Sequence, residues 1–139
     1  MTVQTFFIHL STRGGSDIHD LSAELARILQ ESSLRAGIIT VFTPSSTSAV
    51  TTIEYEPGCV HDLQRLLDEL VDPQREYQHN QRWHDGNGHS HLRAALLKAS
   101  LTIPFYEGRL ALGDWQQLVF IDFDNRPRKR ELVVQVMGE

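Results

Sequence analysis

The carboxyl-terminal third of the sequence constrains the fold most, because strand-like segments follow one another there with only turns between them. Apolar and polar residues alternate over 101–106, 116–123 and 130–137, and Glu107-Gly108 and Asp124-Asn125 supply turn residues. Neighbouring strands joined by short turns pair antiparallel. This part of the chain therefore predicts a β-meander and argues against a doubly wound parallel sheet.

The rest of the chain alternates strands with amphipathic helices. Strand-like segments cover 3–10, 37–43 and 49–56, and a loop at 13–16 follows the first of them. Apolar residues at helical spacing predict one helix from Leu21 and a second over 60–71, which ends before Pro73. A short third helix is expected over 92–99. The pattern predicts one α+β domain spanning 1–139, with antiparallel or mixed sheets, two longer helices and one short one.

Composition narrows the classes of function. A formal charge of −5 gives no field that would draw the chain onto DNA or RNA, so no nucleic-acid partner is expected. The apolar run Leu118–Ile121 is far short of the ~20 residues that cross a bilayer, and no membrane partner is expected. Cys59 is the single cysteine, and the amino terminus lacks a secretory pattern, so the expected location is cytoplasmic.

An irregular segment, 74–90, breaks the periodic pattern. Of the seven histidines in the chain, His84, His89 and His91 fall within eight positions around Asp85. Imidazoles and a carboxylate are suitable ligands for a divalent transition metal such as zinc. His91 would lie in the first turn of the third helix, where the helix dipole favours a neutral ring. The alternative is that these histidines are solvated loop residues.

Other polar groups suggest anion binding. Gly86 and Gly88 precede the third helix and would leave its amino-terminal N–H groups open to a phosphate. The hydroxyl-rich stretch 43–48 offers donors to phosphate oxygens, although such residues also form turns. Arg126, Arg128 and Arg130 alternate near the last strand, where they would either clamp an anion or protect a sheet edge.

Two carboxylates also lie at strand period. Glu54 and Glu56 would project from one face of the strand 49–56, where one of them would serve as a metal ligand or a general base. A solvated strand face is the alternative reading.

Three stretches of the chain carry a family resemblance: the run His89-Ser90-His91-Leu92-Arg93-Ala94-Ala95-Leu96-Leu97, the segment 100–104, and Gly108-Arg109-Leu110-Ala111-Leu112-Gly113-Asp114-Trp115-Gln116. These stretches resemble the YjbQ family, also called the secondary thiamine-phosphate synthase family. The early strand pair, from Val41-Phe42-Thr43-Pro44 to Glu54, and the closing Arg128-Lys129-Arg130 are similar to the family as well, so the resemblance covers nearly the whole chain.

The resemblance implies a β-sandwich within an α+β fold, a homotrimer, and a pocket near the subunit boundary that holds a metal or an anion. It implies metal-associated positions at His79, Asp85 and His91, with Glu54 as a neighbouring carboxylate. Ser45 stands where the family commonly has a histidine, and asparagines commonly flank the glutamate where Ile53 and Tyr55 stand here. His89 or His84 would then complete the ligand set.

Two hypotheses of function follow. The first is a zinc- and phosphate-binding enzyme acting on a small phosphorylated metabolite, as a transferase similar to thiamine-phosphate synthase or as a hydrolase using metal-bound water. Glu54, Asp85 and His91 are its candidate catalytic residues, and His79, Asp85, His89 and His91 its candidate metal ligands. Its candidate substrate-binding residues are Arg93, Trp115, Gln116, Arg128 and Arg130. The second hypothesis is a non-catalytic homotrimer that binds a metal or an anion.

Overall fold

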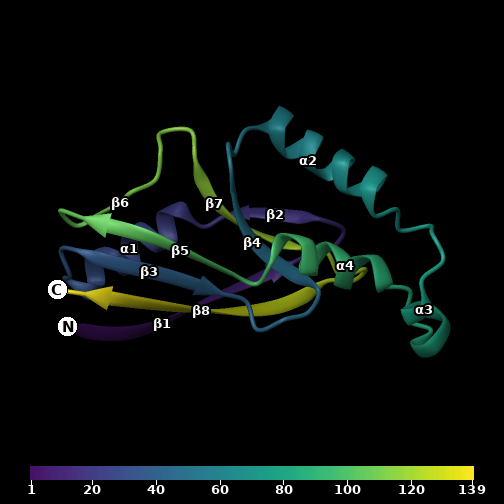
Figure 1. Cartoon of the computed structure of the whole chain (residues 1–139), viewed down its shortest axis with the longest axis horizontal. Helices are drawn as coiled ribbons and strands as arrows, with labels where there is room; N and C mark the ends of the chain where they lie inside the picture. Colours follow the sequence, from purple (N-terminus) through teal and green to yellow (C-terminus); the bar gives the residue numbers. More distant parts are fainter.

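Eight strands form two sheets in which every pairing is antiparallel, in a computed structural model that describes residues 1–139 (Figure 1). The larger sheet has the order β1 (Thr2–Thr12), β8 (Arg128–Gly138), β3 (Gly37–Phe42), β5 (Ser100–Tyr106) and β6 (Arg109–Leu110). The smaller sheet has the order β2 (Asp17–Asp20), β7 (Gln117–Asp122) and β4 (Ser48–Ile53). The α+β class with antiparallel sheets is confirmed.

Four helices accompany the sheets, one more than the sequence predicts. They are α1 (Ser22–Ser32), α2 (Pro57–Leu70), α3 (Gln78–Trp83) and α4 (Gly88–Leu97). The unexpected α3 lies inside the irregular segment 74–90 and buries no residue, so it has no apolar stripe that a periodic pattern would reveal. The third predicted helix corresponds to α4, which begins at Gly88 instead of Leu92. No helix has the length and apolarity required to span a membrane.

The first core cluster lies between the two sheets and α1. From α1, Leu25 and Ile28 are fully buried. They meet Val41 and Val134 from the inner face of the larger sheet and Phe120 from the smaller sheet. Each such side chain contributes about 2 kcal/mol through removal of its apolar surface from water. The helical spacing of α1 therefore serves mainly to fill this layer.

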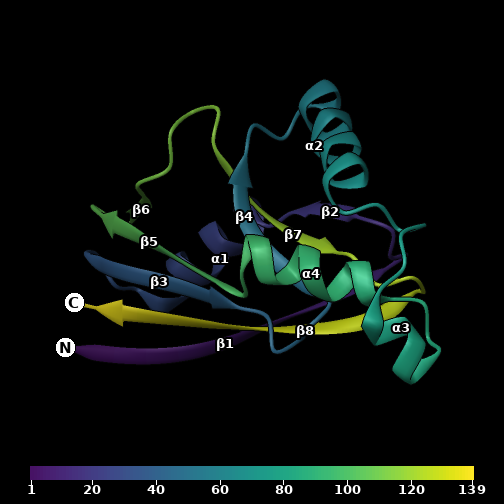
Figure 2. The ribbon, with the colours of Figure 1, turned by 45° about the vertical axis from the view of Figure 1, so that its right-hand side comes forward.

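The second core cluster lies on the other face of the smaller sheet, where α2 and α4 cover it (Figure 2). Leu67 of α2 and Ala94 of α4 pack there against Val119 and Ile121 of β7. Because β7 is the central strand of its sheet and is covered on both faces, it reads as a continuous apolar run. The sequence feature Leu118–Ile121 is explained by this position.

The chain passes between the two sheets three times at one end of the molecule. Residues 13–16 join β1 to β2, residues 43–47 join β3 to β4, and residues 123–127 join β7 to β8. The registers place these connections together, since Asp122 pairs with both Asp17 and Ser48, and Thr12 pairs with Arg128. We call this region the crossover end. It gathers the polar groups described below.

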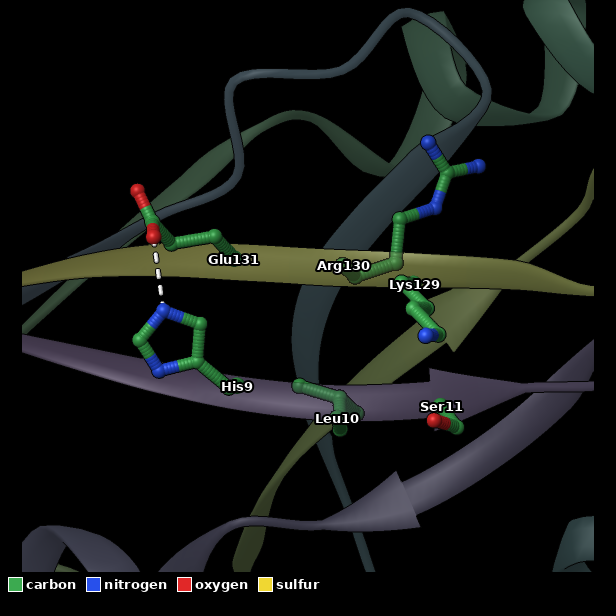
Figure 3. A pocket seen from close by; sticks show the side chains of 6 residues that line it. All are labelled: His9, Leu10, Ser11, Lys129, Arg130 and Glu131. Carbon is green, nitrogen blue, oxygen red and sulfur yellow. Dashed lines mark hydrogen bonds and ion pairs between the residues drawn. The ribbon is translucent and has the colours of Figure 1, made fainter.

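The outer face of the larger sheet is not covered by a helix. Phe7, Ile38 and Phe42 are exposed there. Toward the crossover end the same face becomes charged, with His9 Nε2 2.6 Å from Glu131 Oε2 (Figure 3). Figure 3 also shows how β8 alternates, because Arg130 reaches toward the neighbouring loop while Lys129 does not.

Candidate functional site

The crossover end is built on two fully buried aspartates at the carboxyl end of β7. Asp122 accepts hydrogen bonds from Arg130 Nε at 2.7 Å and from Arg130 Nη2 at 2.9 Å, so the guanidinium binds both carboxylate oxygens. The same guanidinium donates to the hydroxyls of Ser45 and Thr47 at 2.9 and 2.8 Å. A buried carboxylate requires such a partner because an isolated charge is strongly destabilised in the interior. Arg130 thereby ties β7 to the connection 43–47.

Asp124, two residues later, is also paired with an arginine of β8, through one carboxylate oxygen. Arg128 Nε donates to its carboxylate at 2.7 Å, and the backbone N–H of Asn125 donates at 2.8 Å. Burial alone would raise the pKa of Asp124, but the Asn125 N–H and the Arg128 guanidinium outweigh burial and lower the pKa below its ordinary value. Asp124 is therefore ionised, and its charge contributes to the field around the neighbouring histidines.

Tight packing between α3 and α4 brings two histidines together. The side chain of Asn80 on α3 accepts a hydrogen bond from the backbone N–H of Gly88 at 2.8 Å, which occupies the first N–H of α4. A Cβ at Gly88 would lie 2.7 Å from Tyr77 Cβ, so only glycine permits this approach. Gly88 serves helix packing, and the predicted phosphate seat at this N–H is already filled by Asn80.

His79, Asp85 and His91 lie close together at this junction. The rings of His79 and His91 have centroids 4.4 Å apart, and His79 Nδ1 is 3.3 Å from Asp85 Oδ1. Asn87 lies between two carboxylates: turned one way its amide donates to Asp124 Oδ1 at 3.4 Å, and turned the other way to Asp85 Oδ1 at 3.0 Å. The structure thus places two imidazoles and one carboxylate at the start of α4.

Both histidines of α4 favour the neutral form. Burial lowers the pKa of His91, and the charge of His79 lowers it further, against a smaller opposing effect of Asp85. Burial also lowers the pKa of His89, and the positive charge of Arg93 acts in the same direction. A neutral imidazole is the form that binds a metal ion or accepts a proton.

His89 does not join the pair formed by His79 and His91. Two positions apart on α4, the side chains of His89 and His91 point about 200° apart around the helix axis. His89 is buried, lies beside Ser90 with Nε2 3.5 Å from its hydroxyl, and has no partner for Nδ1. The structure accordingly separates His89 from the other predicted metal ligands. His84 ends α3 in a left-handed conformation and is exposed.

The arginines predicted to bind substrate have partners within the protein. Arg93 is buried and donates to Ser16 Oγ at 2.9 Å, to the carbonyl of Val71 at 2.8 Å and to Asp68 at 3.0 Å. Arg128 and Arg130 do share one side of β8, as the alternation predicts, but that side faces Asp124 and Asp122. In this structure all three guanidinium groups therefore hold elements of the fold together.

Glu54, Trp115 and Gln116 lie at the opposite end of the smaller sheet. Ser48 begins β4 at the crossover end, whereas Glu54 follows its last residue, and five residue steps of strand span about 17 Å. Gln116 Nε2 donates to Thr52 Oγ1 at 3.3 Å near that end, and Trp115 is 77% exposed. Within one chain these residues do not meet the histidines.

The predicted strand face shared by Glu54 and Glu56 does not exist. β4 ends at Ile53, and Glu56 adopts an extended conformation as the N-cap of α2. Its carboxylate accepts hydrogen bonds from the backbone N–H groups of Gly58 and Cys59, because these are among the unpaired donors of the first turn. Pro57 starts the helix directly after the cap and interrupts strand pairing.

Sequence reasoning missed Asp122, Asp124, Asn80 and Asn87. Asp122 and Asp124 follow an apolar run and are spaced two residues apart, as are Arg128 and Arg130 after the turn. Carboxylates at the end of a buried strand, followed by arginines at matching spacing, would have indicated paired charges. Fold and site together define a two-sheet α+β protein with a histidine–carboxylate cluster at its crossover end.

Comparisons with known proteins identify one family and several relatives that match this chain over most of its length. The family described as UPF0047 protein YjbQ-like matches residues 7–139. A UPF0047 protein of Methanothermobacter thermautotrophicus is 36% identical over 139 residues, which is 100% of this chain and 95% of the relative. A UPF0047 protein of Archaeoglobus fulgidus is 34% identical over 128 residues, or 92% of this chain and 97% of the relative.

Solved structures agree with the sequence relatives. A crystal structure of a hypothetical protein from Aeropyrum pernix has a TM-score of 0.91 at 29% identity, covering 98% of this chain and 99% of that one. A YbjQ-like protein of unknown function from Sulfolobus solfataricus has a TM-score of 0.89 at 28% identity, covering 99% of this chain and 100% of that one. The chain belongs to the UPF0047 YjbQ-like family.

Replacement of Arg130 by glutamine is expected to destabilise the fold by about 3–5 kcal/mol, because Asp122 would keep a buried charge without its partner. Denaturant unfolding measures this change. The double variant Arg130→Gln, Asp122→Asn should recover part of the loss, and Arg126→Gln in the exposed connection serves as the matched control. A loss below about 1 kcal/mol for Arg130→Gln would contradict a buried ion pair.

The lowered pKa of His89 predicts the pH dependence of stability. The unfolded histidine, with a pKa of 6.5, binds a proton more readily than the folded one. Stability is therefore greatest above that value and falls as the pH drops through it. His89→Gln should give a shallower decline in Tm between about pH 7.5 and pH 5 than the parent. His61→Gln, on the exposed side of α2, should keep the slope of the parent. Equal slopes for the parent and His89→Gln would contradict this role.

Proposed function

We propose that the protein is a metal- and phosphate-binding enzyme that acts on a small phosphorylated metabolite. The observation that carries this proposal is the proximity of His79, Asp85 and His91. The ring centroids of His79 and His91 lie 4.4 Å apart, and His79 Nδ1 lies 3.3 Å from Asp85 Oδ1. A histidine with a lowered pKa beside a second histidine and a carboxylate is unusual in a surface region unless it serves binding or proton transfer. The low pKa of His91 supports the same conclusion.

The donor set suits a transition metal, with zinc as the proposed ion. Two imidazoles and a carboxylate are ligands that zinc accepts in catalytic sites, with a further position left for substrate or water. No group of three or more histidine, cysteine, aspartate or glutamate side chains converges on one point in the structure. Binding therefore requires His79 to turn its Nδ1 away from Asp85, so that both side chains face the ion. When bound, such an ion would polarise a substrate oxygen.

The surroundings of His91 support a phosphorylated substrate. A cavity of about 280 Å³ lies beside its ring, lined by the hydroxyl-bearing residues Ser45, Ser46 and Ser48. Hydroxyl donors and a nearby cation are the groups that bind phosphate oxygens in many sites. The resemblance to the secondary thiamine-phosphate synthase family makes thiamine-phosphate formation the first activity to test. In the proposed site His79, Asp85 and His91 hold the metal, and His91 also lines the cavity for the substrate.

One observation favours a second function, that of a non-catalytic homotrimer binding a metal or an anion. Of the predicted catalytic residues, Glu54 lies at the far end of β4 and leaves Asp85 as the carboxylate of the cluster. Ser45 stands where the family commonly has a histidine. It offers a hydroxyl in place of an imidazole, and this hydroxyl accepts a hydrogen bond from Arg130. In this alternative the cluster sets affinity and no covalent bond is broken.

The proposed homotrimer has a candidate contact surface on the outer face of the larger sheet. Three rows of residues cross four strands there, and none of them is charged. Read from β1 to β5, the rows are Val3, Met137, Ile38 and Pro104; Thr5, Gln135, Thr40 and Thr102; and Phe7, Val133, Phe42 and Ser100. Solvated sheet faces usually carry charged residues, and uncharged apolar patches mark contact surfaces. We assign this face to contacts between copies of the chain.

The metal proposal predicts stoichiometric zinc in the protein after loading and dialysis, measured by elemental analysis. His91→Ala should lose most of it, since one ligand of the set is removed. His61→Ala is the matched control on an exposed helix face, and Glu54→Ala should also retain the metal because Glu54 lies at the other end of the sheet. A parent protein without bound zinc would show the metal proposal to be wrong.

The catalytic part has a separate readout. Rescue of a thiamine-requiring bacterium that lacks its main synthase should occur with the parent and fail with His91→Ala. Equal rescue by the two proteins would remove His91 from the reaction. Zinc binding without any rescue would favour the non-catalytic alternative.

The proposed trimer predicts that Phe42→Asp, in the uncharged row nearest the crossover end, gives a monomer. Light scattering after size-exclusion chromatography should give the parent three times the 15.8 kDa of the chain. A buried unpaired carboxylate at an interface strongly disfavours association. Leu70→Asp, at an exposed apolar position on α2, should leave the mass unchanged. The same mass for Phe42→Asp and the parent would exclude this face as the contact.

A further inference from the structure

Lys98 has a backbone conformation that L-residues rarely adopt. Its φ of 76° and ψ of 161° lie in a region populated almost only by glycine. The surrounding backbone holds it there, because its N–H donates to the carbonyl of Ala94 at 2.8 Å and its own carbonyl accepts from the N–H of Val50 at 3.1 Å. A lysine at this position weakens the fold relative to glycine. Such strain often marks a residue retained for its side chain.

The position of Lys98 connects it to the site. Residues spaced by three or four along a helix share one face, so His91, Ala95 and the C-cap residue Lys98 follow one another along α4. All three line the cavity beside His91, together with Ser45 and Ser46 from the connection 43–47. The small side chain of Ala95 leaves the space between His91 and Lys98 open.

The opposite wall supplies a hydroxyl with a set orientation. Ser45 Oγ accepts hydrogen bonds from Arg130 Nη1 at 2.9 Å and from the backbone N–H of Thr47 at 3.2 Å. Ser45 Oγ also lies 3.4 Å from Thr47 Oγ1, so its own proton can be donated either to Thr47 or to a ligand in the cavity. An ammonium on one wall and a hydroxyl donor on the other suit an anion with several oxygens.

We propose that this cavity is an anion subsite, in which Lys98 and Ser45 bind a phosphate group of the substrate beside His91. The inference rests on the proposed function, because it assumes a phosphorylated substrate whose reacting part lies at His91. It also gives a reason for a lysine at a glycine-like position, because Lys98 lines the cavity at the end of α4. Ser46, which is exposed on the same connection, provides a second hydroxyl.

The chain offers a matched control, because Lys129 is its only other lysine. Lys129 lies on β8 and borders the shallow pocket formed with His9, Ser11 and Glu131 (Figure 3). It is exposed, as Lys98 is, but it lies on another face and has an ordinary strand conformation. Loss of either lysine removes the same net charge, so a difference in anion affinity between the two variants is due to the position of the lysine.

The test measures binding of inorganic phosphate and pyrophosphate by calorimetry, with and without zinc, to the parent and to four variants. Lys98→Gly and Lys98→Ala should weaken binding about tenfold or more, as expected for loss of a charged hydrogen bond. Ala95→Leu should weaken it by filling the cavity. Lys129→Ala should bind as the parent does. Lys98→Gly should also raise Tm by about 5 °C through relief of strain, which separates lost binding from lost folding.

The outcomes separate this inference from the proposed function. Phosphate binding by the parent that Lys98→Gly and Lys98→Ala leave unchanged would overturn the subsite, even if zinc binding at His91 were intact. A parent that binds neither anion would overturn it as well. Phosphate binding that depends on Lys98 but not on Lys129 supports the subsite, including in a protein that fails to bind zinc.

Discussion

The bidentate contact between Arg130 and Asp122 is the interaction on which the arrangement of the molecule depends. The chain crosses from one sheet to the other three times at one end of the molecule, so polar backbone and side-chain groups must lie between the two sheets there. Asp122 and Asp124 are both fully buried at that point, and each has an arginine from β8 as its partner. Arg130 further binds the hydroxyls of the connection 43–47, so one guanidinium joins elements that are distant in sequence.

The geometry of the site follows from this charged framework. Asn87, just before α4, donates to Asp124 or, with its amide turned, to Asp85, and Ser90 in the first turn of α4 donates to the carbonyl of Phe123. These contacts fix the start of α4 against the connection 123–127. The ring of His91 is thereby held beside the connection 43–47, where Ser45 and Ser46 line the same cavity. Burial at this junction is the main reason that His91 stays neutral.

Local sequence patterns predicted most of the helices and strands but only part of the candidate site. The alternation over residues 101–137 predicted the antiparallel strands, and the apolar spacing from Leu21 and over 60–71 predicted α1 and α2, because these patterns report which face is buried. The short elements β2, β6 and α3 were missed, since two to six residues give no readable period. Glu54 was misplaced because Pro57 and the capping carboxylate of Glu56 end β4 early. The partners of Arg130 depend on contacts between residues as far apart as 85 positions, which no local pattern encodes.

The construction of α3 has a consequence for the site as a whole. Because α3 buries no side chain, the bond between Asn80 and Gly88 and the ring contact between His79 and His91 account for much of its attachment at this junction. Elements with few buried apolar contacts open locally at low free energy while the core stays intact. His91 lies on α4, which Ser90 attaches to the carbonyl of Phe123, whereas His79 lies on α3, which has no buried side chain. Local opening of α3 is therefore expected to cost less free energy than exposure of the core.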